Sequence, residues 1–170
     1  MDTGTVRAGL EKSTYKIRRA ECEKFVSILN EAGYRIKCLA DIKDKAVYDK
    51  ILSQFASKYP DLCDRLKYVF FAQQRFYRML DAWKAGDIET VGGIFRQDGI
   101  GLRDDYKISG PEMETMCDIA RTIPGVLGER MLGGGDKGAA GALVGAEAAD
   151  ALKRAVDTAY PRSYPQYSGT

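Results

Sequence analysis

A glycine-rich stretch near the end of the chain has the residue types that bind anions. Residues 122–144 read TIPGVLGERMLGGGDKGAAGALV, two short apolar runs around a polar centre. The central positions are Gly133, Gly134, Gly135, Asp136 and Lys137. Glycine tolerates positive φ and lacks a Cβ, so three glycines let the backbone turn sharply or lie against a ligand. The exposed N–H groups of such a loop make phosphate the first ligand to consider, although a plain hairpin turn has the same pattern.

Few other side chains suit catalysis or metal binding. The 170 residues contain no histidine, so base catalysis would fall to Asp, Glu, Lys or Tyr. The four cysteines are far apart in the sequence, at Cys22, Cys38, Cys63 and Cys117. Without a CxxC pair they indicate neither a zinc site nor a disulfide framework. We interpret them as reduced cysteines of a cytoplasmic protein, and we expect no metal ligands in this chain.

The composition is that of a soluble, one-domain globular protein. Hydrophobic residues make up 45% and charged residues 29% of the chain. The net charge is +2 with acids and bases interleaved, which gives no argument for nucleic acid or membrane partners. The first 20 residues are too polar for a signal peptide, and no apolar run approaches membrane-spanning length.

The apolar spacing predicts helices joined to a small sheet. We expect helices over 13–32, 44–57, 61–85, 87–99 (extending to about 102), 110–123 and 147–160, with a frayed tail at 161–170. Strands are expected at 126–132 and 139–144, with the tail of a third strand at 1–8. The helix over 61–85 carries a stripe that we expect in the core: Leu66, Val69, Phe70, Phe76, Leu80 and Trp83. Together these elements predict an α+β fold with a small antiparallel sheet packed against several helices.

Three segments together resemble the C-terminal half of galactokinases. They are DTGTVR at 2–7 with STY at 13–15 and RRAEC at 18–22, LRDDY at 102–106 with Ser109, and GVLGERMLGGG at 125–135. The family reads Asp-Ser/Thr-Gly-x-x-Arg with Ser-x-Tyr and Arg-Arg-x-x-Cys, then Ser-Leu-Arg-Asp-Asp-Tyr-x-Val-Ser, then Gly-Val-x-Gly-x-Arg-Met-Thr-Gly-Gly-Gly. The last of these is the third signature motif of the GHMP kinases (galactose, homoserine, mevalonate and phosphomevalonate kinases). Their order and spacing agree along essentially the whole chain.

The resemblance implies a bilobal, ATP-dependent sugar 1-kinase of which residues 1–170 form the C-terminal lobe. The implied fold is ferredoxin-like, and this chain would begin within its first strand and end before its last. The family's N-terminal lobe supplies the sugar-recognition signature, the phosphate loop, and the aspartate and arginine assigned to catalysis. We therefore expect no catalytic residue in this chain, no turnover by the chain alone, and binding of ATP and Mg²⁺ only when the N-terminal lobe is present.

The resemblance also implies roles for individual residues. Tyr15 matches the tyrosine that contacts the sugar, although packing at the interface between the lobes would explain a tyrosine there equally well. The three glycines at 133–135 match those lining the cleft near substrate and phosphates. Residues 103–105 (Arg-Asp-Asp) are expected to form a structural charge cluster at a helix end.

The sequence departs from the family at several positions near the implied cleft. Leu132 replaces the Thr before the glycines, and Asp136-Lys137-Gly138-Ala139 replaces Phe-Gly-Gly-Cys. Residues 96–99 read RQDG in place of Asn-Glu-Ser-His. These departures leave galactose specificity open. Lys137 either adds a cation near the transferred phosphate or a substrate carboxylate, or pairs with Asp136 in solvent.

Two function classes remain open from the sequence. One is the kinase lobe, whose partners would be an N-terminal lobe and a monosaccharide such as galactose. The other is a kinase-derived module that senses a sugar or nucleotide, or docks to a partner, without chemistry. An isolated lobe would expose the apolar face that normally meets the other lobe, so self-association is a further expectation.

Overall fold

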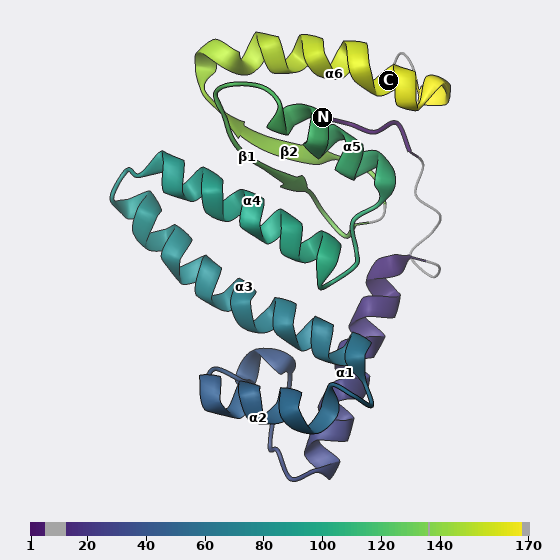
Figure 1. Cartoon of the computed structure of the whole chain (residues 1–170), viewed down its shortest axis with the longest axis vertical. Coiled ribbons are helices and arrows are strands. Elements are labelled where there is room, and N and C mark those ends of the chain that lie inside the picture. The colour runs from purple at the N-terminus through teal and green to yellow at the C-terminus, as the bar shows by residue number, and fades with distance from the viewer. Residues whose placement is uncertain (6–12, 136, 168–170) are drawn as a thin grey trace.

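The computed structural model describes residues 1–5, 13–135 and 137–167, which form the α+β fold expected from the sequence (Figure 1). The elements are α1 (Thr14–Glu31), η2 (Leu39–Asp41), α2 (Lys45–Phe55), α3 (Pro60–Lys84), α4 (Ile88–Asp104), α5 (Pro111–Arg121), β1 (Val126–Met131), β2 (Ala140–Val144), η3 (Ala146–Ala148), α6 (Ala149–Ser163) and η4 (Pro165–Tyr167). No helix of these ranges is both long and apolar enough to cross a membrane.

Local sequence signals set most helix ends. Asp44 and Asp87 are N-caps, and their carboxylates accept hydrogen bonds from the N–H groups of Val47 (2.9 Å) and Thr90 (3.0 Å). Pro60 and Pro111 occupy the first turns of α3 and α5, where the missing N–H has no helical partner to lose. The predicted boundaries therefore agree with the observed ones to within a few residues.

The sheet is small and has a third extended segment beside it. β1 and β2 pair antiparallel, with Met131 opposite Ala140 at the end next to the glycines. The first residues of the chain run along β2: the N–H of Ala140 donates to the carbonyl of Met1 (2.9 Å), and Asp2 forms a bridge with Ala139. Of the strand expected at 1–8, the described residues form only an isolated bridge at Asp2, and positions 6–12 lie outside the described ranges.

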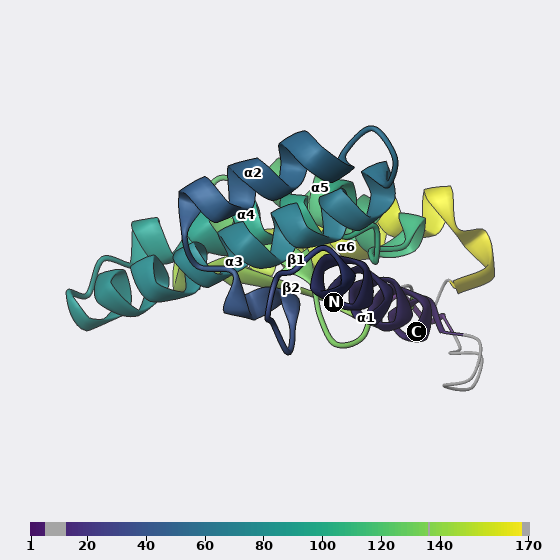
Figure 2. The same cartoon turned by 90° about the horizontal axis from the view of Figure 1, so that it is seen from below.

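Two halves share the long helix α3. In the lower half, α1, η2, α2 and the first part of α3 enclose a core that includes Phe25, Leu29, Ile51, Leu66 and Phe70. Seen from below, α1 and α2 lie on either side of this part of α3 (Figure 2). In the upper half, α4 and α5 pack on the sheet and α6 packs on α5 (Figure 1).

The glycines of α4 allow its backbone to lie against β1. A Cβ on Gly92 would come within 2.4 Å of the Cβ of Leu127, and one on Gly99 would come within 2.7 Å of the Cβ of Arg130. α4 is continuous through both positions. The glycines therefore serve close helix–strand packing rather than breaking the helix.

Two expectations are wrong. The second half of the α3 stripe is not core: Phe76, Leu80 and Trp83 are 58%, 40% and 62% exposed, because no element within the described ranges covers that face. Pro161 does not end the last helix, which continues to Ser163. A turn at Pro165–Tyr167 follows, and the ring of Tyr164 lies 5.1 Å from that of Tyr160, so this part of the tail is ordered by aromatic packing.

Candidate functional site

Tyr15 and the glycine loop, defined as residues 132–138, meet at one surface. Tyr15 lies in the first turn of α1, and its side chain is 46% exposed. A Cβ built on Gly134 would lie 3.8 Å from the Cβ of Tyr15, which is ordinary van der Waals contact. Gly133 is exposed and Gly134 half-buried. The structure thus brings together two groups that are about 120 residues apart in the sequence.

The loop needs glycine at defined positions. Gly133 and Gly135 have φ values of +78° and +79°, in the left-handed region that other residues rarely adopt. Gly135 is buried, and a Cβ on it would lie 2.3 Å from the carbonyl oxygen of Ile108. The N–H of Lys137 then donates to the carbonyl of Gly135 (2.8 Å), which closes the turn. Asp136, predicted as part of this loop, lies outside the described residues.

The segment 102–109 supports the loop from the side of α1. Arg18 donates from Nε to the carbonyl oxygen of Lys107 (3.0 Å), and Ile108 contacts Gly135. Lys107 has a φ of +51° and its Nζ lies 3.1 Å from Asp61 and 3.3 Å from Asp64 at the start of α3. This segment therefore joins α1, α3 and the glycine loop.

Two threonines near the N-terminus hold the other end of the loop. Thr3 donates from both its N–H and its hydroxyl to the carbonyl of Gly138, and the N–H of Gly138 donates to Oγ1 of Thr5 (3.0 Å). The two hydroxyl oxygens lie 2.6 Å apart and both residues are buried. Sequence reasoning used these residues only as part of a family pattern. Their support of the loop depends on a contact across more than 130 residues, which no local signal reveals.

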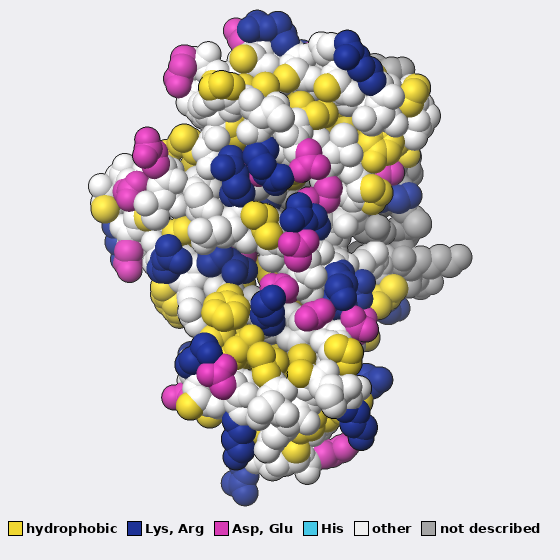
Figure 3. All heavy atoms as spheres, viewed as in Figure 1, with side chains coloured by type: hydrophobic (Ala, Val, Ile, Leu, Met, Phe, Trp, Pro, Cys, Tyr) yellow, Lys and Arg dark blue, Asp and Glu magenta, His cyan; other side chains and the backbone are white. Residues whose placement is uncertain are grey.

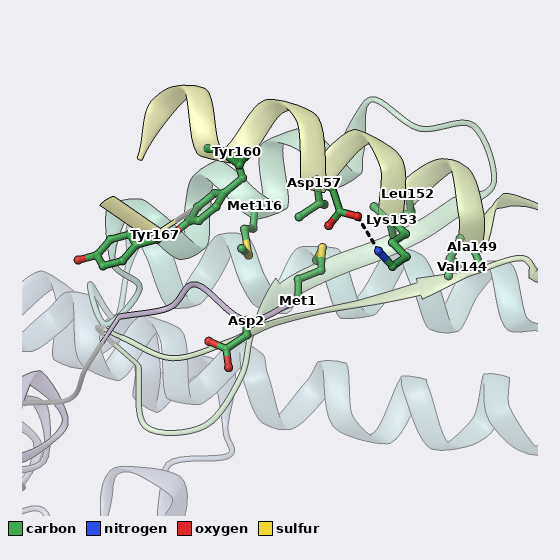
Figure 4. A pocket seen from close by; sticks show the side chains of 12 residues that line it. Met1, Asp2, Met116, Val144, Ala149, Leu152, Lys153, Asp157, Tyr160 and Tyr167 are labelled. Atoms are coloured by element: carbon green, nitrogen blue, oxygen red, sulfur yellow. Dashed lines mark hydrogen bonds and ion pairs between the residues drawn. The ribbon is translucent and has the colours of Figure 1, made fainter. Parts of the chain in front are cut away.

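Tyr160 of α6 completes this support. Its hydroxyl donates to the carbonyl oxygen of Thr3 (2.8 Å). Burial raises the pKa of Tyr160 to about 12, so the hydroxyl remains a proton donor at neutral pH. Beside it, a cavity of about 500 Å³ lies between α6, α5, β2 and the first two residues (Figure 4). Figure 4 shows Met1, Met116 and Leu152 along its walls, so the cavity is mainly apolar.

A charge cluster lies beneath the site, between α1 and α3. Glu21 accepts hydrogen bonds from Arg65 (2.6 Å) and from Arg18 (2.7 Å). Burial raises the pKa of Glu21, but the hydrogen bonds from these two guanidinium groups outweigh it and leave the pKa below its ordinary value. The almost fully buried Arg65 also donates to the backbone carbonyl of Asp105.

The residues Arg103, Asp104 and Asp105 form the structural charge cluster expected from the sequence. Asp105 pairs with Lys67 (2.8 Å), and Arg103 pairs with Asp104 (2.7 Å) and more loosely with Glu114 (3.6 Å). These ion pairs connect α3, α4 and α5 next to the segment that supports the loop. Their charges are thus paired within the fold.

Two buried carboxylates in the upper half were not singled out from the sequence. Glu129 of β1 accepts from Arg96 (2.9 Å) and from Arg121 (2.8 Å). Asp98 accepts a paired contact from Arg75 (3.0 and 2.9 Å) and another from Arg130. A charged residue inside a predicted strand was the one signal available for the first of these, and Arg130 of the same strand shares it. The second gives a structural reason for the departure from the family at position 98.

The groups on this surface are suited to ligand binding rather than to general acid–base catalysis. It offers a phenol, open backbone of the glycine loop and the half-buried Lys137. The exposed apolar side chains Ile17 (54%) and Leu132 (41%) come from the same two elements. Nowhere in ranges 1–5, 13–135 and 137–167 do three or more His, Cys, Asp or Glu side chains gather in a way that would hold a metal ion.

The chain is similar to galactokinases in sequence and in fold. Galactokinase from Chloroflexus aurantiacus is 36% identical over 161 residues, and the match covers 94% of this chain and 40% of that protein. Galactokinase from Limosilactobacillus fermentum is 33% identical over 151 residues, covering 89% of this chain and 38% of that protein. The crystal structure of Lactococcus lactis galactokinase complexed with galactose superposes with a TM-score of 0.85 at 27% identity over 96% of this chain.

The chain is galactokinase-like. It spans about two fifths of the length of the galactokinases that it matches, and 41% of the crystallised Lactococcus chain. No protein-family model matches it. The resemblance drawn from the three sequence segments is therefore confirmed at the level of a galactokinase-like sequence and fold, and the roles of individual site residues remain predictions.

Proposed function

We propose that this chain is the C-terminal lobe of a galactokinase-like sugar 1-kinase, which transfers a phosphoryl group from ATP to galactose or a related monosaccharide. The observation that carries the proposal is the proximity of Gly134 to Tyr15, since a Cβ added to Gly134 would lie 3.8 Å from the Cβ of Tyr15. This proximity supports a surface on which the exposed Tyr15 binds a polar sugar and the neighbouring glycine backbone binds an anionic phosphate. The similarity to a galactokinase crystallised with galactose supports a sugar as the substrate.

In this proposal each group has a role that its chemistry allows. The hydroxyl of Tyr15 hydrogen-bonds a sugar hydroxyl and fixes the orientation of the sugar. The backbone N–H groups of the open loop, with Lys137 beside them, face the phosphates. Positioning and charge neutralisation are what phosphoryl transfer requires of the protein, so a rigid loop is itself a contribution to rate.

These residues could form one wall of a cleft that binds ATP. By themselves they do not provide the ligands that Mg²⁺ requires. Gly133, which has a left-handed φ, is exposed and Gly134 is half-buried, and such open glycine backbone suits a phosphate. The described residues offer no cluster of metal ligands, so the ligands of Mg²⁺ would come from the other lobe. ATP supplies the phosphoryl group when bound. The N-terminal lobe supplies the remaining reactive groups, and the isolated chain is inactive.

Reconstitution of the two lobes tests this proposal. The chain is mixed with a separately expressed N-terminal lobe of a galactokinase, and ATP-dependent phosphorylation of galactose is measured. We expect activity from the mixture and none from either part. Phosphorylation by the chain alone would contradict the proposal. Sugar binding by the chain, with no activity in any mixture, would instead favour the non-catalytic sensing module.

Variants of the site then separate the roles of its residues. In the active mixture, Tyr15→Phe should raise KM for galactose up to about tenfold, the equivalent of one hydrogen bond, and leave KM for ATP unchanged. Lys137→Ala should raise KM for ATP instead. Tyr77→Phe is the matched control, because Tyr77 is an exposed tyrosine on α3. Equal KM values in all three variants would remove Tyr15 and Lys137 from the site.

A further inference from the structure

The second half of α3 presents an uncovered apolar face with regular spacing. Val69, Gln73, Phe76, Leu80 and Trp83 follow one another at intervals of four, three, four and three residues; we call them the α3 seam. This is the spacing at which one helix packs along another over two heptads. Phe76, Leu80 and Trp83 are the exposed members, and the exposed Tyr77 packs beside them with its ring 5.5 Å from that of Phe76.

The seam contains both a hollow and a projection. The hollow has a volume of about 310 Å³ and is lined by Tyr68, Val69, Ala72, Gln73, Phe76 and Tyr77, so its centre is level with Gln73. Two to three turns further along the same face, the indole of Trp83 projects into solvent. In the space-filling view, hydrophobic side chains show between Lys and Arg side chains along the band that α3 occupies (Figure 3).

We propose that the α3 seam binds a second copy of this chain, with the two α3 helices antiparallel. A two-fold axis level with Arg78 places Trp83 of each copy opposite Gln73 of the other, over the hollow. The same axis places Leu80 opposite Phe76. Trp83 of each copy would then fill the hollow of the other copy, which gives two equivalent contacts. A single helix with hollow and projection at these positions is self-complementary, which is the requirement for a two-fold interface.

The charges of α3 are compatible with this pairing. Arg78 and Asp81, the charged residues in the middle of the exposed half, lie outside the seam in its helical spacing, and both are exposed. The residues that flank the seam nearest the axis are Tyr77 and Met79, which are uncharged. No like charges therefore meet where the two helices would touch.

The size of the contact predicts a weak dimer. With the axis level with Arg78, residues 73–83 of the two copies face each other and Val69 lies beyond the paired stretch. The contact therefore falls in the class of small interfaces, below about 1,200 Å² in total. Dissociation in the micromolar range is therefore expected. The dimer would use a surface separate from the candidate site, because the α3 seam and Tyr15 lie on different helices and the glycine loop packs against α1 and residues 107–108.

Sedimentation velocity across the micromolar range tests the inference on the complete chain. We expect wild type to form dimers and Trp83→Glu to remain monomeric with an unchanged circular dichroism spectrum. Ile17→Glu is the matched control, an equally exposed apolar residue on α1, and should dimerise as wild type does. A monomeric wild type at all concentrations overturns the proposal. So does loss of the dimer in Ile17→Glu but not in Trp83→Glu.

Crosslinking then tests the register and the identity of the partner. In a Cys38→Ser background, which removes the exposed thiol, Tyr77→Cys lies next to its equivalent across the axis. A short bifunctional maleimide should link two copies of this variant and fail to link copies of Val47→Cys. Addition of an N-terminal kinase lobe should leave this crosslink intact. A crosslink to the added lobe instead of the second copy would assign the α3 seam to that lobe and overturn the proposal.

Discussion

The glycine loop and the exposed half of α3 differ in how side-chain size relates to burial. The loop is made of the smallest residues, yet it is held by the carbonyl of Ile108 on one side and by Thr3 and Thr5 on the other. The α3 seam carries the chain's only tryptophan, and its members Phe76, Leu80 and Trp83 are exposed among the residues that the structure describes. The size of its side chains therefore does not indicate how well a segment of this protein is packed. The buried contacts of its backbone do indicate it.

The largest expected effect comes from adding one methyl group to the loop. Gly135→Ala must move the backbone of Ile108 and adopt a left-handed φ, so we expect a loss of about 2–4 kcal/mol in the free energy of unfolding. Urea denaturation measures it. Gly134→Ala is the control, because its nearest neighbour would be 3.8 Å away and its effect should be far smaller. Equal losses in the two variants would mean that the loop is not held against residue 108.

A smaller effect is expected at the other end of the loop. Thr5→Val removes the acceptor for the N–H of Gly138 and leaves that group unpaired, which should cost about 1–3 kcal/mol. Thr5→Ser keeps the hydroxyl and should recover most of the stability. Hydrogen exchange of the Gly138 amide, measured by NMR, should become faster in Thr5→Val alone. Slow exchange in both variants would show that Gly138 is protected by another contact.

The charge cluster beneath the site predicts a further, acid-dependent loss. The pKa of Glu21 is lowered in the folded protein, so the folded state favours the ionised form. The contribution of this group is present above its ordinary pKa of 4.5 and is lost as pH falls through the lower folded value. Denaturation at a series of pH values should show this acid limb, and Glu21→Gln should flatten it. An unchanged limb in that variant would assign acid sensitivity to other carboxylates.

The smallest effect on stability is expected where the side chain is largest. Trp83→Ser removes an indole that is 62% exposed, so the free energy of unfolding of the monomer should change by less than about 0.5 kcal/mol. Thermal unfolding at concentrations below dimer formation measures it. A loss comparable to that of Gly135→Ala would contradict the contrast between the two regions.

The sequence predicts the elements of this fold well because their signals are local. Asp44, Asp87 and Pro111 mark helix starts in the sequence and do so in the structure, and the two strands around the glycines are where apolar runs predict them. The α+β class followed from these elements, and the similarity to galactokinases followed from the quoted segments. The candidate site was predicted to the extent that Tyr15 and the glycines were named together.

What could not be predicted depends on distant parts of the chain. Periodicity places Phe76 and Leu66 on comparable faces of one helix, but only the first half of that helix has α1 and α2 beside it. The support of Gly138 by Thr3 and Thr5 likewise requires knowing which extended segment lies beside β2. Glu129 of β1 acquires its arginine partners from α4 and α5, and Asp98 of α4 acquires them from α3 and β1. The sequence does not show which of these elements lie side by side.

The contacts of residues 1–5 affect the order in which the glycine loop can fold. Its threonines hold Gly138, and the hydroxyl of Tyr160 holds Thr3 in turn, so contacts more than 130 and 150 residues apart must form together. Closing such long loops of chain is slow compared with forming the helices between them. During synthesis the hydrogen bond from Tyr160 to Thr3 can therefore form only after α6 has left the ribosome, so this support of the candidate site is acquired late.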